Sequence, residues 1–116
     1  MFKALRTVIY RVNHLQKAKE WYINITGIQP YFDEPFYVGF NINGFEPGLD
    51  PDSSNVQQGN NSIAYRAVDN IEQAVEKCVS DGAVIESPVQ NAGGAIYVAV
   101  IKDPFGNSVG LITGAL

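Results

Sequence analysis

Two carboxylates and one arginine are the groups of this sequence most suited to chemistry. Glu46 lies two residues before Gly48, so both share a face if the strand is regular, and Asp50 follows. A carboxylate on the inner face of a curved sheet could bind a cation or act as a base; the alternative is an exposed loop carboxylate. Arg11 could hold an anionic group at the rim of that face, or lie across apolar neighbours with its charge in water.

The only histidine and the only cysteine have ordinary structural explanations. His14 falls at the start of a predicted helix, where a solvated side chain is the expected state. Cys78 lies on the apolar stripe of a second predicted helix, together with Ile71 and Val75. A buried structural thiol is therefore favoured over a nucleophile.

An internal repeat positions these groups. Residues 12–18 (VNHLQKA) and 68–74 (VDNIEQA) align 56 positions apart in a chain of 116 residues. Each copy runs a helix into a glycine, reaches an aromatic-valine pair and closes on Gly-Leu. Two equivalent units are expected to pack around a shared cleft, because repeated units bury their apolar faces against each other.

Each copy predicts a strand, a helix and three short strands. Capping patterns open the two helices: Asn13 with Gln16, and Asp69 with Glu72. The first copy is expected to form a strand at 4–12, a helix at about 15–26, and strands at about 28–33, 36–43 and 45–49. The second copy is expected to form a helix at about 71–81 and strands at about 83–87, 95–102 and 108–113. Residues 51–61 are polar and aperiodic and are interpreted as a linker between two βαβββ modules, 1–50 and 62–116, of one α+β domain.

Composition excludes several classes of protein. With 46% hydrophobic and 17% charged residues, the chain is typical of one compact globular domain. Its net charge is −4 and its eight basic residues are scattered, which argues against nucleic acid as a partner. It has neither an N-terminal apolar run typical of a signal peptide nor an apolar run of roughly 20 residues that could span a membrane. We expect a cytoplasmic protein without a membrane partner.

The doubled βαβββ unit, the Val-x-x-Leu-x-x-Ala helix start and the closing Asp-Pro-Phe-Gly-Asn-x-x-Gly-Leu at 103–111 resemble the vicinal oxygen chelate superfamily. This group includes glyoxalase I, extradiol dioxygenases, fosfomycin-resistance enzymes and bleomycin-resistance proteins. The resemblance covers about residues 4–113. It implies that the two modules curve into a cup-shaped, incompletely closed mixed sheet with the helices outside.

The resemblance also implies where a metal would lie. Metal-dependent members hold it with histidine and glutamate at the start of the first strand and the end of the last strand of each module. Carried over residue by residue, these places are Thr7, Gly48, Ile63 and Gly110. A metal needs three or more converging nitrogen, sulfur or oxygen donors, and none of the four is a usual ligand. We therefore expect no metal and no other cofactor.

An apolar and aromatic concavity remains. We expect its ligand-binding residues on the inner faces of the strands: Thr7, Ile9, Arg11, Tyr37, Glu46, Gly48, Ile63, Tyr65 and Gly110. Arg66 would then point toward the helix, and a slipped register would reverse that assignment. No catalytic residue is predicted. An aromatic site with few polar groups favours binding over catalysis.

The sequence therefore predicts a metal-independent protein that binds a small organic molecule, aromatic or cationic, and could sequester a drug or toxin. Resemblance to the bleomycin-resistance branch implies a homodimer. The alternative is a metal-dependent lyase, isomerase or dioxygenase whose metal is held by displaced ligands such as Glu46, Asp50 or His14. A regulatory or interacting module is a third hypothesis, which a cup filled by its own side chains would favour.

Overall fold

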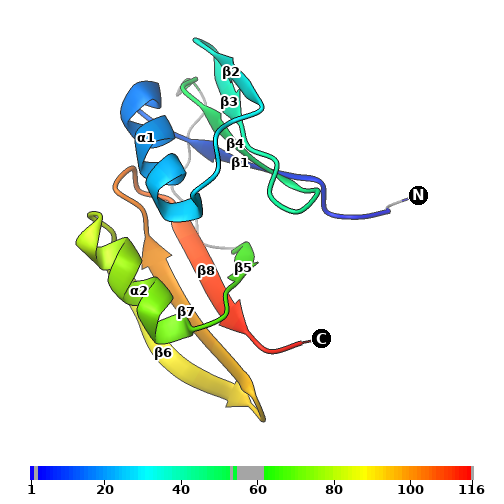
Figure 1. Cartoon of the computed structure of the whole chain (residues 1–116), viewed down its shortest axis with the longest axis vertical. Helices are drawn as coiled ribbons and strands as arrows, with labels where there is room; N and C mark the ends of the chain where they lie inside the picture. Colours follow the sequence, from blue (N-terminus) through cyan, green and yellow to red (C-terminus); the bar gives the residue numbers. More distant parts are fainter. Residues whose placement is uncertain (2, 53, 55–61, 116) are drawn as a thin grey trace. The chain divides into compact units, whose positions relative to one another are not determined.

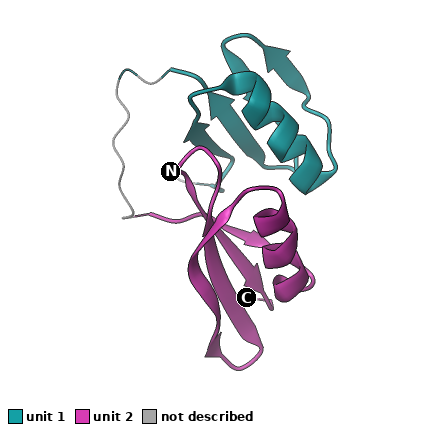
Figure 2. Cartoon of the chain, turned by 90° about the vertical axis from the view of Figure 1, so that its left-hand side faces the viewer, with its two compact units in different colours: residues 1–57 teal, residues 58–116 magenta. Residues whose placement is uncertain are grey.

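The chain divides into two compact units, residues 1–57 and 58–116 (Figure 2). This computed structural model describes residues 1, 3–52, 54 and 62–115. Most of the predicted linker, residues 53 and 55–61, lies outside the described residues. In the part of the chain that is described, no helix has both the length and the apolar character needed to cross a membrane.

Both units repeat one order of elements (Figure 1). The first contains β1 (Thr7–Arg11), α1 (Leu15–Thr26), β2 (Phe32–Glu34), β3 (Tyr37–Gly39) and β4 (Glu46–Asp50). The second contains β5 (Tyr65–Ala67), α2 (Ile71–Ser80), β6 (Val84–Gly93), β7 (Ile96–Lys102) and β8 (Ser108–Thr113). The α+β class and the two βαβββ modules are confirmed.

Each unit builds a four-stranded mixed sheet, in the order β1-β4-β3-β2 or β5-β8-β7-β6. The first strand of each unit pairs parallel to the last, and the remaining pairs are antiparallel. Neither sheet closes into a barrel. One helix packs on one face of each sheet, because its apolar side chains recur on a single side. The buried helix residues are Ala18, Trp21 and Tyr22 in α1 and Ile71, Val75 and Cys78 in α2.

Cys78 is buried among these residues, as predicted. Burial, and then the negative charge of Asp81, raise the pKa of its thiol. A thiol with a raised pKa carries little of the thiolate that a nucleophile needs. The structural role favoured from the sequence fits this position.

The predicted helix caps are wrong by one residue. His14 and Asn70, rather than Asn13 and Asp69, are the N-caps. His14 Nδ1 accepts from the backbone amide three residues later at 3.4 Å, and Asn70 Oδ1 does the same at 3.1 Å. A side-chain acceptor at the N-cap satisfies an amide that has no partner within the helix. This contact accounts for the single histidine.

Several predicted strands are too long. The runs predicted at 28–33 and 36–43 contribute only Phe32–Glu34 and Tyr37–Gly39, and the strand predicted at 4–12 spans Thr7–Arg11. Asn43 and Gly44 have φ angles of 52° and 92°, so the chain turns there before β4. Conversely, β6 extends well beyond the predicted 83–87, and its pairing with β7 continues across three register shifts.

The Asp-Pro-Phe-Gly-Asn motif is a turn organised by one buried carboxylate. Asp103 is 3% exposed. Its Oδ1 accepts from the backbone amides of Phe105 at 2.9 Å and Asn107 at 2.8 Å, and its Oδ2 accepts from Asn107 Nδ2 at 3.1 Å. These bonds bring β7 and β8 into register, which places Gly110 opposite Val100.

Candidate functional site

Strand pairing in the first unit brings most of the predicted site residues onto one face. β1 pairs with β4 so that Thr7, Ile9 and Arg11 lie beside Glu46, Gly48 and Asp50. Paired residues point to the same side of a sheet, and neighbours along a strand point to opposite sides. The intervening residues Tyr10 and Leu49 are buried on the α1 side. We call the opposite side, which also carries Tyr37, the open face of unit 1.

Glu46 is the polar centre of this face. It is 7% exposed, although it is ionisable. The hydroxyl of Tyr31 donates to its Oε1 at 2.6 Å, and the hydroxyl of Tyr37 donates to its Oε2. Arg6 Nη1 forms an ion pair with Oε1 at 3.5 Å and donates to Thr7 Oγ1 at 2.7 Å. The carboxylate that the sequence singled out is thus held by two phenols and a guanidinium.

Two glycines make room for this cluster. A Cβ on Gly48 would clash with the Tyr37 hydroxyl, and a Cβ on Gly39 would lie 2.8 Å from Glu46 Oε2. Real Cβ atoms do not approach other heavy atoms so closely. The missing side chain at Gly48 is therefore what lets Tyr37 reach Glu46.

The hydrogen bonds keep the cluster in one protonation state. Burial has the largest influence on Glu46 and raises its pKa, but the bonds from Tyr31 and Tyr37 and the charge of Arg6 outweigh it, so the pKa lies below its ordinary value. Burial, followed by the bond and charge of Glu46, raises the pKa of Tyr37. The bond to Glu46 is the main cause of the raised pKa of Tyr31. Near neutral pH the cluster is an ionised carboxylate between two neutral phenols.

A pocket of about 190 Å³ opens beside this carboxylate. Its lining comes from the segment before β1, from Tyr31, and from the turn between β3 and β4: Arg6, Tyr31, Asn41, Gly44, Phe45 and Glu46. It is smaller than the 300–1,000 Å³ or so of typical pockets for drug-sized ligands. It therefore suits a small molecule or one group of a larger molecule.

An aromatic surface adjoins the cluster on β2 and β3. The Phe32 ring lies 6.0 Å from Tyr37, 5.9 Å from Phe36 and 6.5 Å from Tyr31, measured between ring centroids. Phe36 and Tyr31 are 66% and 58% exposed. Tyr10 does not belong to this surface, because it is buried in the core on the α1 side of the sheet. Exposed rings of this kind offer stacking surface to a planar ligand.

The other predicted residues of unit 1 have different surroundings. Arg11 Nη1 pairs with Asp50 Oδ2 at 3.0 Å, so this arginine has an internal counter-ion. Ile9 is 44% exposed on the open face. Asp50 lies at the opposite end of β4 from Glu46, and Arg11 balances its charge.

In the second unit, Tyr65 and Gly110 are paired neighbours of β5 and β8. A Cβ on Gly110 would fall on the Tyr65 ring. Arg66 pairs with the buried Leu111, so both side chains lie on the α2 side of the sheet. This is the predicted register, in which Tyr65 faces away from the helix. Ile63 is half-buried and precedes β5 rather than belonging to it.

The residues at the four metal places do not fit a metal. Tyr37 fills the space next to Gly48, Tyr65 fills the space next to Gly110, Ile63 has no donor atom, and the Thr7 hydroxyl accepts a hydrogen bond from the Arg6 guanidinium. The displaced set fits no better, because Glu46 is held by the tyrosines, Asp50 by Arg11, and His14 caps α1. Among the described residues, no three His, Cys, Asp or Glu side chains gather as a metal site would require.

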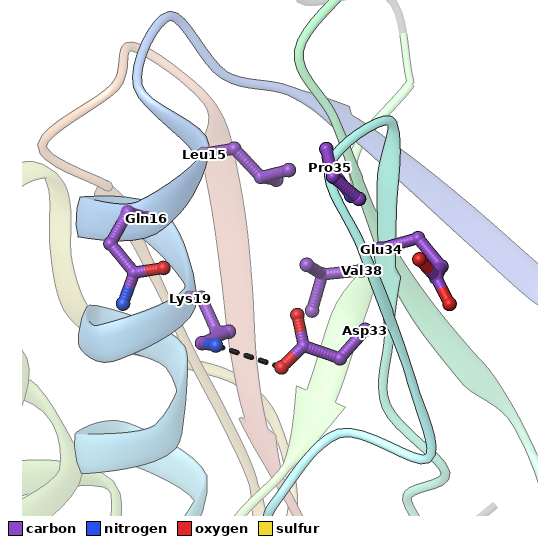
Figure 3. A pocket seen from close by; sticks show the side chains of 7 residues that line it. All are labelled: Leu15, Gln16, Lys19, Asp33, Glu34, Pro35 and Val38. Atoms are coloured by element: carbon purple, nitrogen blue, oxygen red, sulfur yellow. Dashed lines mark hydrogen bonds and ion pairs between the residues drawn. The ribbon is translucent and has the colours of Figure 1, made fainter.

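A second, wider groove lies on the α1 side of the same unit. It has a volume of about 430 Å³ and is lined by Leu15, Gln16, Lys19, Asp33, Glu34, Pro35 and Val38. Figure 3 shows Lys19 reaching from α1 to Asp33 of β2, with a distance of 2.8 Å between Nζ and Oδ2. Its two central charges are hydrogen-bonded to each other, whereas Glu46 faces a pocket. The open face is therefore the stronger candidate.

Sequence reasoning missed Tyr31 and Arg6. Tyr31 immediately precedes β2, and its backbone amide donates to the carbonyl oxygen of Gly39 at 3.0 Å. Because Tyr31 lies outside the strand, the alternation of side chains along β2 does not predict where its side chain points. Arg6 precedes β1 and reaches Glu46 through its long side chain. Gly48 was one available signal. A glycine on the same face as Glu46 leaves space for an aromatic ring from a neighbouring strand, and Tyr37 fills that space.

Solved structures share this fold across almost the whole chain. The fosfomycin resistance protein FosX from Listeria monocytogenes has a TM-score of 0.82 at 17% identity, over 100% of this chain and 97% of that chain. A glyoxalase/bleomycin resistance protein/dioxygenase family enzyme from Burkholderia phytofirmans PsJN has a TM-score of 0.81 at 16% identity, over 96% and 98%. Lactoylglutathione lyase from Agrobacterium tumefaciens has a TM-score of 0.74 at 20% identity, over 96% and 93%.

At these identities the structures establish the fold alone. No curated protein matches the chain. The profile of the Glyoxalase/Bleomycin resistance protein/Dioxygenase superfamily matches residues 4–111. The chain therefore belongs to the glyoxalase/bleomycin resistance protein/dioxygenase superfamily.

Proposed function

We propose that the protein binds a small organic molecule on the open face of unit 1 and does so without a metal ion. The observation that carries the proposal is the buried Glu46 carboxylate at the wall of the pocket of about 190 Å³. An ionised carboxylate has about four acceptor positions, and Tyr31 and Tyr37 occupy one each. The remaining positions can accept from a ligand donor, while Tyr31 and Phe45 supply apolar wall.

The cluster is better suited to binding than to turnover. A general acid or base works best with a pKa near the operating pH. Here the pKa of Glu46 is displaced downward and the pKa values of Tyr31 and Tyr37 upward, all away from neutrality. A carboxylate that stays ionised and phenols that stay neutral keep a fixed pattern of charge, which serves recognition. Sequestration of a drug or toxin, as in bleomycin resistance, is the biological role that we propose.

Ligand-observed NMR with a library of small, soluble organic fragments tests the binding site. We expect fragments to bind the wild type and to lose binding in Asn41→Trp, because the larger side chain fills the pocket from its exposed wall. Asn24→Trp is the matched control: it is an exposed asparagine of the same unit, on α1. The site would be refuted if no fragment bound the wild type, or if fragments bound Asn41→Trp and Asn24→Trp equally well.

Metal independence has its own measurement. We expect fragment binding to be unchanged by EDTA, and the melting temperature to be unchanged by millimolar zinc, nickel, manganese or iron(II). A metal that binds only the folded protein must raise the melting temperature. A rise with one of these metals, abolished by Glu46→Gln and retained in Glu34→Gln, would replace the proposal with the metal-dependent lyase, isomerase or dioxygenase.

We also propose that the protein acts as a homodimer, as the resemblance to the bleomycin-resistance branch implies. Sedimentation velocity at micromolar concentration measures this directly. A monomer at all concentrations up to 100 micromolar or so, well above the Kd of a stable dimer, would refute it without affecting the site on unit 1.

A further inference from the structure

We infer that the pocket beside Glu46 recognises a zwitterionic head group of the α-amino-acid type. This inference rests on the proposed function and specifies its ligand class. Its basis is the juxtaposition of opposite charges at the pocket wall, where Arg6 Nη1 lies 3.5 Å from Glu46 Oε1. The Arg6 side chain is 77% exposed and the Glu46 side chain 9%. The cation can therefore move, whereas the anion is fixed.

The arginine retains donors for a ligand carboxylate. A guanidinium has five N–H donors in a planar fork that matches a carboxylate. Within the described residues, Arg6 Nη1 donates to Thr7 Oγ1, the guanidinium also interacts with Tyr31, and its contact with Glu46 is too long for a normal hydrogen bond. Asn41 adds a donor, because its Oδ1 accepts from Gly44 N at 3.0 Å and its amide nitrogen remains.

The carboxylate retains acceptor positions for a ligand ammonium. Tyr31 and Tyr37 each donate to a different oxygen of Glu46, so each oxygen keeps a lone pair. The pocket thus offers guanidinium and amide donors beside carboxylate acceptors. An α-amino acid carries a carboxylate and an ammonium on one carbon atom, so its two charges match this close spacing.

Charge balance favours a ligand with both charges over one with a single charge. A lone cation at Glu46 would lie beside the like charge of Arg6, and a lone anion at Arg6 would draw the guanidinium away from the buried Glu46 carboxylate. Separating a buried charge from its partner is costly. A zwitterion supplies a counter-charge to each side chain. The volume of about 190 Å³ admits the head group and a side chain lying against Tyr31 and Phe45.

Isothermal titration calorimetry of the full chain at pH 7 tests the inference with three matched probes. L-phenylalanine carries both charges, phenethylamine only the positive charge, and 3-phenylpropionate only the negative charge. We expect L-phenylalanine to bind the wild type at least tenfold more tightly than either analogue. Arg6→Gln should weaken the binding of L-phenylalanine to the level at which the wild type binds phenethylamine. Glu46→Gln should weaken the binding of L-phenylalanine to the level at which the wild type binds 3-phenylpropionate. Lys3→Gln, which removes another exposed cation, is the control for Arg6→Gln.

Glu46→Gln also disturbs a buried cluster, so its folding is checked by Trp21 fluorescence. Arg6→Gln, at an exposed residue, decides the matter if Glu46→Gln does not fold. Equal affinity for the three probes, tighter binding of a single-charge analogue, or no binding of any probe would overturn the inference. The fragment experiment with Asn41→Trp then reports separately whether the proposed function still stands.

Discussion

The hydroxyl of Tyr37 occupies the space in which a side chain on residue 48 would begin, and from there it donates to Glu46. Three residues on two strands thus depend on one another: Gly48 leaves the space, the Tyr37 ring fills it, and the Tyr37 hydroxyl donates a hydrogen bond to Glu46. In the second sheet a ring also covers the glycine of the last strand, but it comes from the first strand of the module: Tyr65 of β5 covers Gly110 of β8.

Gly48→Ala tests the close approach. Gly48 does not have a positive φ, so alanine is strained there only by contact with Tyr37. We expect a loss of about 1–3 kcal/mol in the free energy of unfolding, which is typical of overpacking. Urea unfolding followed by Trp21 fluorescence measures it, because the single tryptophan is buried in unit 1. The same change in a Tyr37→Ala background should cost much less, and equal costs in the two backgrounds would contradict the contact.

Tyr37→Phe and Tyr65→Phe should differ, although both remove one hydroxyl. Tyr37→Phe leaves Glu46 Oε2 without its donor, and an unsatisfied buried acceptor costs about 1–3 kcal/mol. In Tyr65 the ring atoms, not the hydroxyl, cover Gly110, so the loss should stay below about 0.5 kcal/mol. Urea unfolding is followed by Trp21 fluorescence for the first variant and by circular dichroism for the second. Similar losses would show that the Tyr37 hydroxyl contributes nothing specific.

Glu46 should make unit 1 sensitive to acid. Its folded-state pKa lies below the ordinary value of 4.5, so its contribution to stability is complete above that value and is lost as pH falls through the folded-state pKa. We expect the unfolding free energy of the wild type to fall more steeply than that of Glu46→Gln between about pH 5 and pH 3. The exposed Glu34→Gln should keep the wild-type slope. Parallel curves for the wild type and Glu46→Gln would contradict the assignment.

The helices were predictable from the sequence because their signals are local. In α1, Leu15, Ala18 and Tyr22 recur at helical spacing, and Gly27 ends the helix with a φ of 71°. β2 and β5 have three residues each, too few for alternation to set their bounds. Pairing with β3 and β8 defines these strands, and that pairing depends on residues distant in sequence.

The site was partly predictable for the same reason. Spacing from Gly48 singled out Glu46, and alternation placed Thr7 and Ile9 on the same face. Gly48 itself was interpreted as a missing metal ligand and as a residue of the ligand-binding face, not as the space that a ring would fill. Local sequence patterns do not record the two contacts that complete the site. Tyr37 fills the space next to Gly48, and Tyr31 donates to Glu46 from outside a strand.

The N-cap residues of the two helices, His14 and Asn70, are expected to differ in how much they stabilise their units. Asn70 caps α2 with a bond of 3.1 Å, so Asn70→Ala should cost about 1 kcal/mol, typical of a lost N-cap. His14 caps α1 with a longer bond of 3.4 Å, and asparagine is a better capping residue. His14→Asn should therefore stabilise unit 1 by a few tenths of a kcal/mol or more, measured by Trp21 fluorescence in urea. Fragment binding should not change, because α1 lies on the other face of the sheet from Glu46. Loss of binding in His14→Asn would instead place the histidine in the site and reopen the hypothesis of displaced metal ligands.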